Sequence, residues 1–423
     1  MPGRRTTLTR KVTSCLCTIT LLALNAAVIR ADAVADWNQI MLVTVAGQNP
    51  FAQARFAAIV QLAVFEAVNA CTPLYEPYLS TVHAPAGASA DAAAVAAAHT
   101  VLTHYFPSSS VALDAARNES LAAIADGQSK SDGIAVGEAA AAAVIQARAN
   151  DGATPPLTFL PATSDPGVWQ PTPPGFGPGT LLHWRNLRLF GLKSSDQFRS
   201  DPPPSLTSER YALDYREVML VGSATSMDRP QDRTDVARFF AAASAVYAWN
   251  TALRQVEDAA GRTLAEKARA FGLLNMAISD ALVASIETKY YYQLWRPVTA
   301  IRAGNVDGNP ETAGDGAWTP LITTPTFPSY PSAHASASYA ARRILESIFD
   351  DDQSFTLTHP AVAGVTLHYT SFHGLTDDID DARVYGGIHF RFDQQAGGRQ
   401  GRQVGRFIYE HYLRPIASGH ANR

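Results

Sequence analysis

Apolar residues recur every three or four positions along most of the chain, which is the spacing of one buried face of an α-helix. The pattern starts near Asp36 and is clear in the stripe formed by Phe56, Ile59, Val60 and Ala63. Later stretches are rich in alanine, with Leu, Val and Ile at regular intervals, and predict helices that pack closely. The expected later helices cover residues 90 to 105, 111 to 126, 132 to 149, 207 to 220, 232 to 257, 263 to 295 and 335 to 348.

No convincing alternation of apolar and polar residues, the mark of a half-buried strand, occurs in the chain. The expected fold class is therefore all-α, built of helical bundles. Irregular segments rich in Pro, Gly and Thr follow at residues 153 to 180 and at Pro202-Pro203-Pro204. They separate an expected N-terminal helical region, 32 to 200, from a C-terminal one, 201 to 423. A single domain with a long surface excursion is the alternative.

Composition narrows the classes of function. Of 423 residues, 47% are hydrophobic and 17% are charged, which predicts a sizeable buried core. The net charge of −4 gives no sign of nucleic-acid binding, so any useful positive charge must be local.

The N-terminus has the parts of a secretory signal peptide. Four basic residues precede a mostly apolar stretch at residues 12 to 28, and small residues follow near 31 to 35. Polar residues interrupt the apolar stretch, which favours cleavage over a membrane anchor. We therefore expect residues 1 to 31 to be removed, leaving a secreted or periplasmic protein with no membrane span. Cys71 would then be the only cysteine, so no internal disulfide could form.

Three segments between residues 289 and 393 carry side chains that bind a tetrahedral oxyanion. The first contains Lys289 and Arg296, whose seven-residue spacing puts them on one face if they share a helix. Pro297 is then expected to end or bend that helix. A solvated basic face is the alternative for this segment alone.

The second segment places Ser332 and His334 at an expected helix start after Pro331. The Ser332 hydroxyl and the free amides of the following turn would favour an anion there. An N-cap serine beside a surface histidine is the alternative.

The third segment contains Arg383, His389 and Asp393. His389 and Asp393 are four residues apart, so we expect neighbours on one helical face, with the carboxylate fixing the imidazole tautomer. Such a histidine can be a nucleophile or a metal ligand, although a surface ion pair is the alternative. Since Arg presents a planar fork of donors and Lys a point charge, the three segments together predict an oxyanion pocket.

These segments resemble the motif blocks of the superfamily that joins type 2 phosphatidic acid phosphatases, bacterial class A acid phosphatases and vanadium-dependent haloperoxidases. Residues 289 to 297 match its K-x6-R-P block, 331 to 334 its P-S-G-H block, and 382 to 389 its S-R-x5-H block. The resemblance is greatest to the secreted haloperoxidase branch. Phe327 occupies a position at which chloroperoxidase-like members resemble one another, whereas bromoperoxidases have His at that position.

The resemblance implies a vanadate cofactor, with hydrogen peroxide and halide as substrates. The groups that would bind the non-bridging oxygens of vanadate are Lys289, Arg296, Ser332, Arg383 and the Ala333 amide. His389 would be the metal ligand in the axial position, Asp393 would orient it, and His334 would be the catalytic acid–base.

Two alternatives share these residues. In a phosphomonoesterase, His389 would attack phosphorus to form a phosphohistidine, and His334 would protonate the leaving alcohol. The second alternative is an oxyanion-binding protein without turnover. Two departures from the motifs are expected to weaken vanadate binding: Ala333 replaces a glycine, and Ala382 replaces the serine before Arg383. The oligomeric state is not specified by these patterns.

Overall fold

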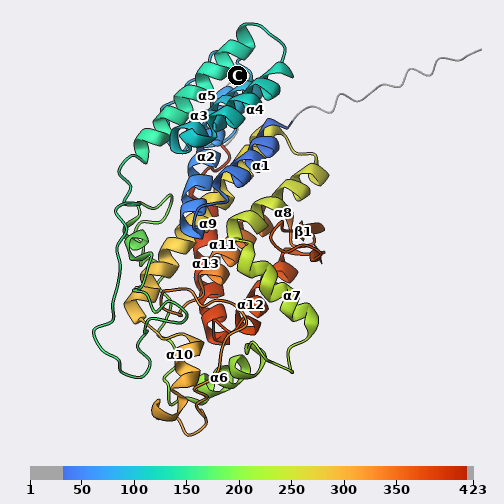
Figure 1. Cartoon of the computed structure of the whole chain (residues 1–423). Coiled ribbons are helices and arrows are strands. Elements are labelled where there is room, and N and C mark those ends of the chain that lie inside the picture. Colours follow the sequence, from blue (N-terminus) through green and yellow to red (C-terminus); the bar gives the residue numbers. More distant parts are fainter. Residues whose placement is uncertain (1–31, 417–423) are drawn as a thin grey trace, which may run out of the picture. The chain divides into compact units, whose positions relative to one another are not determined.

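The computed structural model describes residues 32–416, and these residues form helices with one short hairpin (Figure 1). The expected signal peptide, residues 1–31, lies outside the described residues. The all-α fold class is confirmed. The α-helices of the described residues are α1 Ala33–Val45, α2 Pro50–Cys71, α3 Ala90–Tyr105, α4 Ser110–Ala122, α5 Gln128–Ala147, α6 Glu209–Val221, α7 Gln231–Ala242, α8 Ala245–Ala260, α9 Leu264–Tyr292, α10 Pro297–Arg302, α11 Ala333–Phe349, α12 Phe372–Tyr385 and α13 Arg391–His411.

Helix α9 is the centre of the fold. Helices α2, α11 and α13 pack against it, and α11 and α13 also pack closely against each other. On the other side of α2, the alanine-rich helices α3 and α5 lie against α2 and against each other (Figure 1). The site segments are therefore carried by C-terminal helices that share one central partner.

Two helices are long and apolar enough to cross a membrane by length and composition, α2 and α9. Apolar stretches long enough to span a bilayer therefore occur beyond the N-terminal one. In the structure the most apolar part of α9 is completely buried, and that of α2 nearly so. Both are the kind of helix that forms the core of a folded domain.

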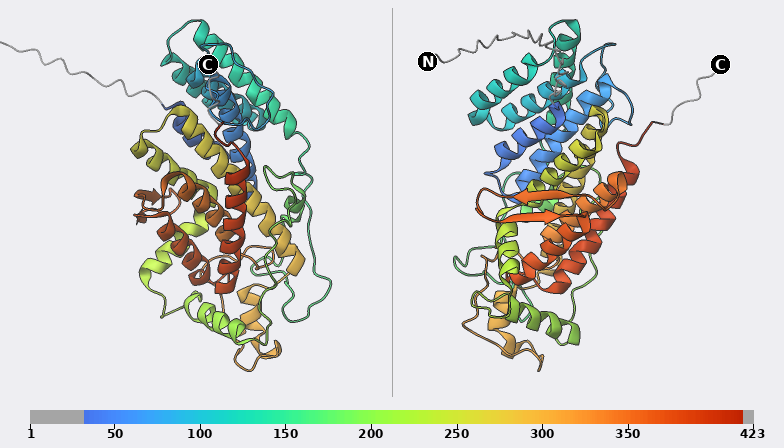
Figure 2. Two further views of the ribbon diagram at one scale, coloured as in Figure 1. Left: turned by 180° about the vertical axis from the view of Figure 1, so that it is seen from behind. Right: turned by 90° about the vertical axis from the view of Figure 1, so that its right-hand side faces the viewer.

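Two local features differ from expectation. The single helix expected at 232 to 257 is two helices, α7 and α8, because Ser244 breaks the run and accepts the Tyr247 amide hydrogen as the cap of α8. A hairpin joins β1, Phe355–Thr358, to β2, Thr366–Tyr369, in antiparallel register. The strands cross in front of the C-terminal helices in the right-hand view of Figure 2. Each has four residues, too few for alternation to be recognised.

The main hydrophobic cluster contains residues from both sides of the expected boundary at residue 200. Phe65 of α2 lies against Gly272 of α9. The irregular connection is tied to the same helix, since the Asp280 carboxylate accepts the amide hydrogens of residues 190, 191 and 192 at 2.7–2.8 Å. Residues from Asp32 onward form one compact unit, so the division at residue 200 stays a prediction about independent folding.

Candidate active site

Lys289 and Arg296 meet through a turn, and the expected continuous helix is wrong. Helix α9 ends at Tyr292 because Gln293 adopts the left-handed conformation, with φ of 53°. Arg296 is the residue just before α10, and Pro297 begins that helix. Lys289 lies in the last turn of α9. The turn at Gln293, and not a shared helical face, therefore brings the two cations to one place.

Both cations are fully buried against the loop that precedes α11. The Lys289 ammonium donates to the carbonyl oxygens of Pro328, at 3.0 Å, and Ser329, at 2.6 Å. Arg296 Nε donates to the carbonyl of Phe327 at 2.8 Å. The Phe327 ring lies 5.4 Å from the ammonium and 5.0 Å from the guanidinium carbon, close enough for cation–π attraction.

A helix starts directly after Ser332, as expected. Its first residue is two positions before residue 335, where the predicted helix began. Helix α11 begins at Ala333, and the Ser332 hydroxyl accepts the Ala335 amide hydrogen at 3.4 Å. The Ser332 amide donates to the backbone carbonyl of Asp393 at 2.9 Å, which joins this helix start to the third segment. Ala333 and His334 line a cavity beside it.

His389 and Asp393 are in contact, but not on one helical face. His389 precedes α13, and Asp393 lies in the first turn of that helix. Asp393 Oδ2 accepts hydrogen bonds from His389 Nδ1 at 2.8 Å, the Ser329 hydroxyl at 2.6 Å and the Phe390 amide at 3.1 Å. A carboxylate at this position commonly reaches back to the backbone before the helix, and this turn presents it to the imidazole.

The imidazole tautomer follows from these contacts. The proton lies on Nδ1, toward Asp393, so Nε2 carries a lone pair and accepts from Arg296 Nη1 at 3.0 Å. Burial lowers the pKa of His389, as do the charges of Arg296, Lys289 and Arg383. The imidazole is therefore neutral in the anion-free site, with Nε2 able to act as a ligand.

Arg383 completes the cluster from the last turn of α12. Its Nη1 donates to the carbonyl of Phe240 at 2.9 Å. Burial lowers the pKa of Arg383 to about 10 and that of Arg296 to about 9. Burial also lowers the pKa of Lys289 well below its usual value, and the Arg296 charge lowers it further. These shifts mean that the cost of burial outweighs the compensation that the Asp393 charge gives to Lys289 and Arg296.

His334 has an unused nitrogen. Its pKa is lowered to about 3 by burial and by the Arg383 charge, against a hydrogen bond to the Ala243 backbone that raises it. Nε2 of His334 has no partner within the described residues. Arg296 Nη2 and Arg383 Nε are likewise buried without a partner there. With Asp393 Oδ1, the cluster thus has four buried polar atoms without a partner in the described part of the chain.

An oxyanion fits this arrangement and a bare metal cation does not. Among the described residues Asp393 is the carboxylate that hydrogen-bonds into the cluster, and its single charge stands against those of Lys289, Arg296 and Arg383. Within residues 32–416 no group of three His, Cys, Asp or Glu side chains could hold a metal ion. The unpaired guanidinium nitrogens need an acceptor, which vanadate or phosphate oxygens would supply.

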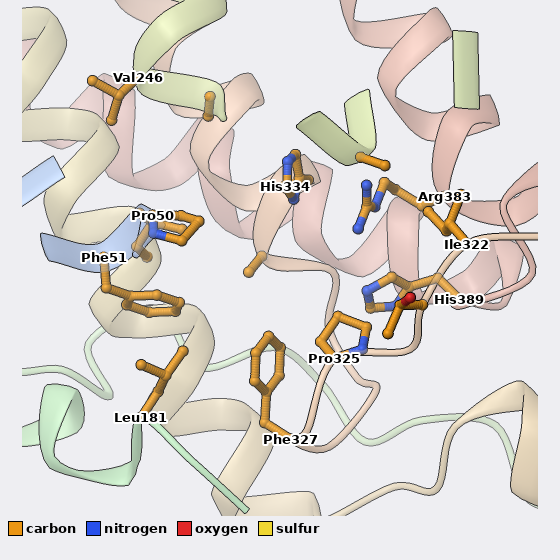
Figure 3. Close-up of a pocket in the computed structure, with 15 residues that line it drawn as sticks. Pro50, Phe51, Leu181, Val246, Ile322, Pro325, Phe327, His334, Arg383 and His389 are labelled. Carbon is orange, nitrogen blue, oxygen red and sulfur yellow. The ribbon is translucent and has the colours of Figure 1, made fainter. Parts of the chain in front are cut away.

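The cavity holds about 400 Å³ and brings the predicted segments together (Figure 3). Ala333, His334, Arg383 and His389 line it. The remaining predicted residues lie directly behind the lining, connected by the contacts described above: Lys289, Arg296, Ser332 and Asp393. All the predicted site residues therefore converge.

Several site residues were not predicted from the sequence. Pro50, Phe51 and Leu181, from the N-terminal half, line the cavity, and they are apolar residues that no motif marks. Ser329 was also missed, although a serine three residues before the helix-capping Ser332 was a visible polar position. Of the two departures from the motifs, Ala382 is a fully buried core residue, whereas Ala333 faces the cavity.

Comparisons with known proteins agree on one group. Residues 269–418 match the family model for the VCPO second helical-bundle domain, a stretch that contains all the predicted site residues. The vanadium chloroperoxidase of Curvularia inaequalis is 26% identical over 179 residues, which is 31% of this chain and 29% of that relative. This match thus spans under a third of the relative's length.

Solved structures extend the similarity over nearly the whole chain. A bacterial vanadium-dependent iodoperoxidase is 26% identical and superposes with a TM-score of 0.76, over 90% of this chain and 96% of that chain. An apo-type bacterial vanadium-dependent chloroperoxidase superposes with a TM-score of 0.70 at 18% identity, over 86% of this chain and 94% of that chain. The second similarity is one of fold.

Proposed function

This chain is a vanadium haloperoxidase-like protein, as its motif segments first suggested, and we propose that it oxidises halide with hydrogen peroxide at a bound vanadate. One observation carries the proposal: three buried cations surround a carboxylate-oriented His389, and two of them, Arg296 and Arg383, have buried donors without a partner among residues 32–416. Each relative described above is named as a haloperoxidase. The phosphomonoesterase and the non-catalytic anion-binding alternatives are therefore not favoured.

Some of the site residues would bind vanadate through charge and hydrogen bonds, and His389 would bind it as a ligand. Lys289, Arg296 and Arg383 would offset the negative charge of its oxygens, and the Ser332 hydroxyl and Ala333 amide would add donors at the start of α11. His389 would be the ligand through Nε2, because Asp393 holds the proton on Nδ1. Bound there, vanadate would supply a Lewis-acidic centre for the oxidation of halide by hydrogen peroxide.

His334 would be the acid–base group that takes up and delivers the proton that the reaction consumes. Oxidation of a halide by hydrogen peroxide gives a hypohalous acid and one water, and it consumes one proton. Nε2 of His334 has no partner among the residues that the structure describes, so it can take up or deliver that proton at the cavity wall. A bound anion would offset the nearby charge of Arg383 and raise the pKa of His334 from its low anion-free value.

We further propose export, with removal of residues 1 to 31. The basic start, the apolar stretch and the small residues that follow support it. The measurement is N-terminal sequencing of the protein recovered from periplasm or medium of an expressing cell. A mature protein that still begins at Met1, or that stays in the cytosol, would contradict this proposal.

The catalytic proposal is tested by two assays on the same purified protein. Halogenation of a soluble trap compound is measured with vanadate, hydrogen peroxide and chloride, bromide or iodide, and phosphate release is measured from an aryl phosphate without vanadate. We expect halogenation, and His389→Ala should reduce it by more than about 100-fold, since even residues that only orient a metal ligand are worth 10–100-fold.

His368→Ala is the matched control, because His368 is an exposed histidine on the hairpin and does not line the cavity. It should keep full activity. Equilibrium dialysis of vanadate should show lost binding in His389→Ala and retained binding in the control. Phosphate release in place of halogenation would contradict the proposal.

A further inference from the structure

The cavity has two chemically different ends. His334, Arg383 and His389 lie together on one side, and apolar side chains, among them Phe51, Leu181 and Val246, form the other (Figure 3). Of the described residues that line the cavity, Thr323 is the one other polar side chain. Vanadate, peroxide and halide are polar and would occupy the first side. The apolar side has no use in the reaction proposed above.

We propose that this apolar side, called the acceptor chamber and formed by Phe51, Leu181, Val246, Leu282 and Phe327, binds the organic molecule that is halogenated. This inference rests on the proposed function. The cavity volume of about 400 Å³ is within the range of small-molecule sites and exceeds what vanadate requires. The acceptor would then be halogenated beside the site, before a hypohalous acid escapes.

The lining predicts an uncharged aromatic acceptor. No carboxylate lines the chamber, so a cationic amine would lose hydration without an ionic partner. An anionic acceptor would be drawn to Arg383 and compete with vanadate. The rings of Phe51 and Phe327 line the cavity and can contact an aromatic ring edge-to-face or offset.

The chemistry requires the same class of molecule. An electrophilic halogen needs an electron-rich carbon, such as a ring carbon of a phenol. That carbon forms a bond to the halogen while the oxygen–halogen bond of the hypohalous acid breaks. The ring proton leaves with the released hydroxide as water. Halide is oxidised by two electrons overall, and hydrogen peroxide, already a substrate in the proposed function, is reduced to water.

The cavity that contains the chamber opens at exposed residues. Among the residues that line the cavity, Pro50, Ala241 and Thr323 are exposed, and the others are buried or half-buried. Ala241 is in the last turn of α7, and its neighbour Ala242 is also exposed but does not line the cavity. The two alanines therefore offer a matched pair: a bulky side chain narrows the opening at one position and lies outside it at the other.

The first test measures binding without turnover. Neutral 2-naphthol and an anionic naphthol sulfonate are titrated into the purified protein free of vanadate, by calorimetry or ligand-observed NMR. We expect 2-naphthol to bind with a dissociation constant below about 1 mM, as a good fragment-sized ligand does. Ala241→Phe should weaken binding by about tenfold or more, and Ala242→Phe should not, since one misplaced group in an apolar pocket has that effect.

Val246→Phe is the second variant, and its ring fills the chamber from inside. It keeps the test decisive if the ring introduced by Ala241→Phe turns toward solvent and leaves the opening free. The proposal is overturned if wild type does not bind 2-naphthol, if the sulfonate binds as well at the chamber, or if both variants bind like Ala242→Phe.

The second test measures products with vanadate, peroxide and halide. Wild type should halogenate 2-naphthol with an isomer ratio unlike that of free hypohalite, and Ala241→Phe should shift the ratio toward free hypohalite. Ala242→Phe, which does not line the cavity, should halogenate the soluble trap at the wild-type rate. Trap turnover with a free-hypohalite isomer ratio overturns the chamber alone, whereas absence of trap turnover in wild type overturns the proposed function.

Discussion

At the residue scale, the main feature of the site is buried positive charge that nearby negative charge does not balance. Lys289, Arg296 and Arg383 are buried together, which is unfavourable unless an anion joins them. Their hydrogen bonds go mainly to backbone carbonyls, which orient the cations without neutralising them. The same environment keeps His334 and His389 neutral. Anion binding would therefore change both the charge balance and the proton affinity of the site.

Ser329 is the residue whose removal best tests the orientation of His389. Its hydroxyl donates to Asp393 at 2.6 Å, and this bond lowers the Asp393 pKa, which burial raises to about 6. Ser329→Ala should raise that pKa further and move the acid limb of the activity profile to higher pH. Vanadate affinity should fall by about tenfold.

Ser338→Ala is the control for loss of a buried serine hydroxyl, because Ser338 is fully buried on α11 and its hydroxyl has no partner within the described residues. It should leave the pH profile unchanged. An unshifted profile in Ser329→Ala would show that Ser329 does not position the pair.

The low pKa of His334 predicts a pH dependence of stability in the anion-free protein. Its pKa is about 3 when folded and near its usual 6.5 when unfolded, so the folded state binds fewer protons between these values. The free energy of unfolding contributed by His334 is therefore complete above pH 6.5 and is lost as the pH falls toward 3. Between pH 7 and 5 the loss is about 2 kcal/mol.

Urea unfolding of wild type and His334→Gln at pH 7 and pH 5 isolates this contribution, because buried carboxylates such as Asp380 act in the opposite sense in both proteins. Wild type should lose stability relative to His334→Gln on acidification. An unchanged difference between the two proteins would contradict the low pKa.

At the element scale, helix contacts set the site geometry. Helix α11 carries Ser332 and His334 at its start, and α13 carries Asp393 in its first turn. The two helices can approach closely because Gly397, Gly401 and Gly405 of α13 face the backbone of α11. Glycines four residues apart on one helix are a sequence signal of such packing, which the sequence analysis did not use.

Gly401→Ala should therefore damage both stability and the site. A methyl group there would lie 2.2 Å from the Ser336 carbonyl oxygen, so the two helices must separate. We expect a loss of about 1–3 kcal/mol in the free energy of unfolding and weaker vanadate binding. Denaturant unfolding and equilibrium dialysis measure the two effects.

Gly398→Ala is the control on the same helix, since its methyl would meet the movable Tyr339 ring at 3.1 Å instead of backbone. A smaller effect on both quantities is expected. Equal effects of the two substitutions would mean that close backbone contact does not set the site.

At the scale of the whole molecule, the N-terminal half completes both the core and the cavity. Helix α2 covers α9, Asp280 of α9 binds the amides at 190–192, and Phe51 and Leu181 form part of the cavity wall. The matched catalytic stretch, 269–418, thus depends on segments far outside it.

A fragment of residues 201 to 423 should therefore neither unfold cooperatively nor bind vanadate, whereas residues 32 to 423 should do both. The first reason is that the fragment exposes the apolar face of α9. The second is that Asp280 loses its three amide donors, so its carboxylate is either buried without partners or exposed to solvent. Thermal circular dichroism and equilibrium dialysis compare the two chains. A cooperative, vanadate-binding fragment would support the domain boundary near residue 200.

The sequence by itself determined the helical class, most helix positions and the chemical identity of the site. Helical periodicity is a local property, and long helices such as α9 display it over many turns. The sequence also shows the types and order of the side chains that oxyanion chemistry requires, namely Lys289, Arg296, His334, Arg383 and His389.

Only the tertiary structure decided how those side chains meet. The left-handed turn at Gln293 and the first turn of α13 replaced the expected helical faces, and both depend on packing against the loop before α11. The apolar wall from Phe51 and Leu181 carries no motif, since any residue of suitable size can fill such a position. Contacts between distant segments are set by the complete core, which no local pattern encodes.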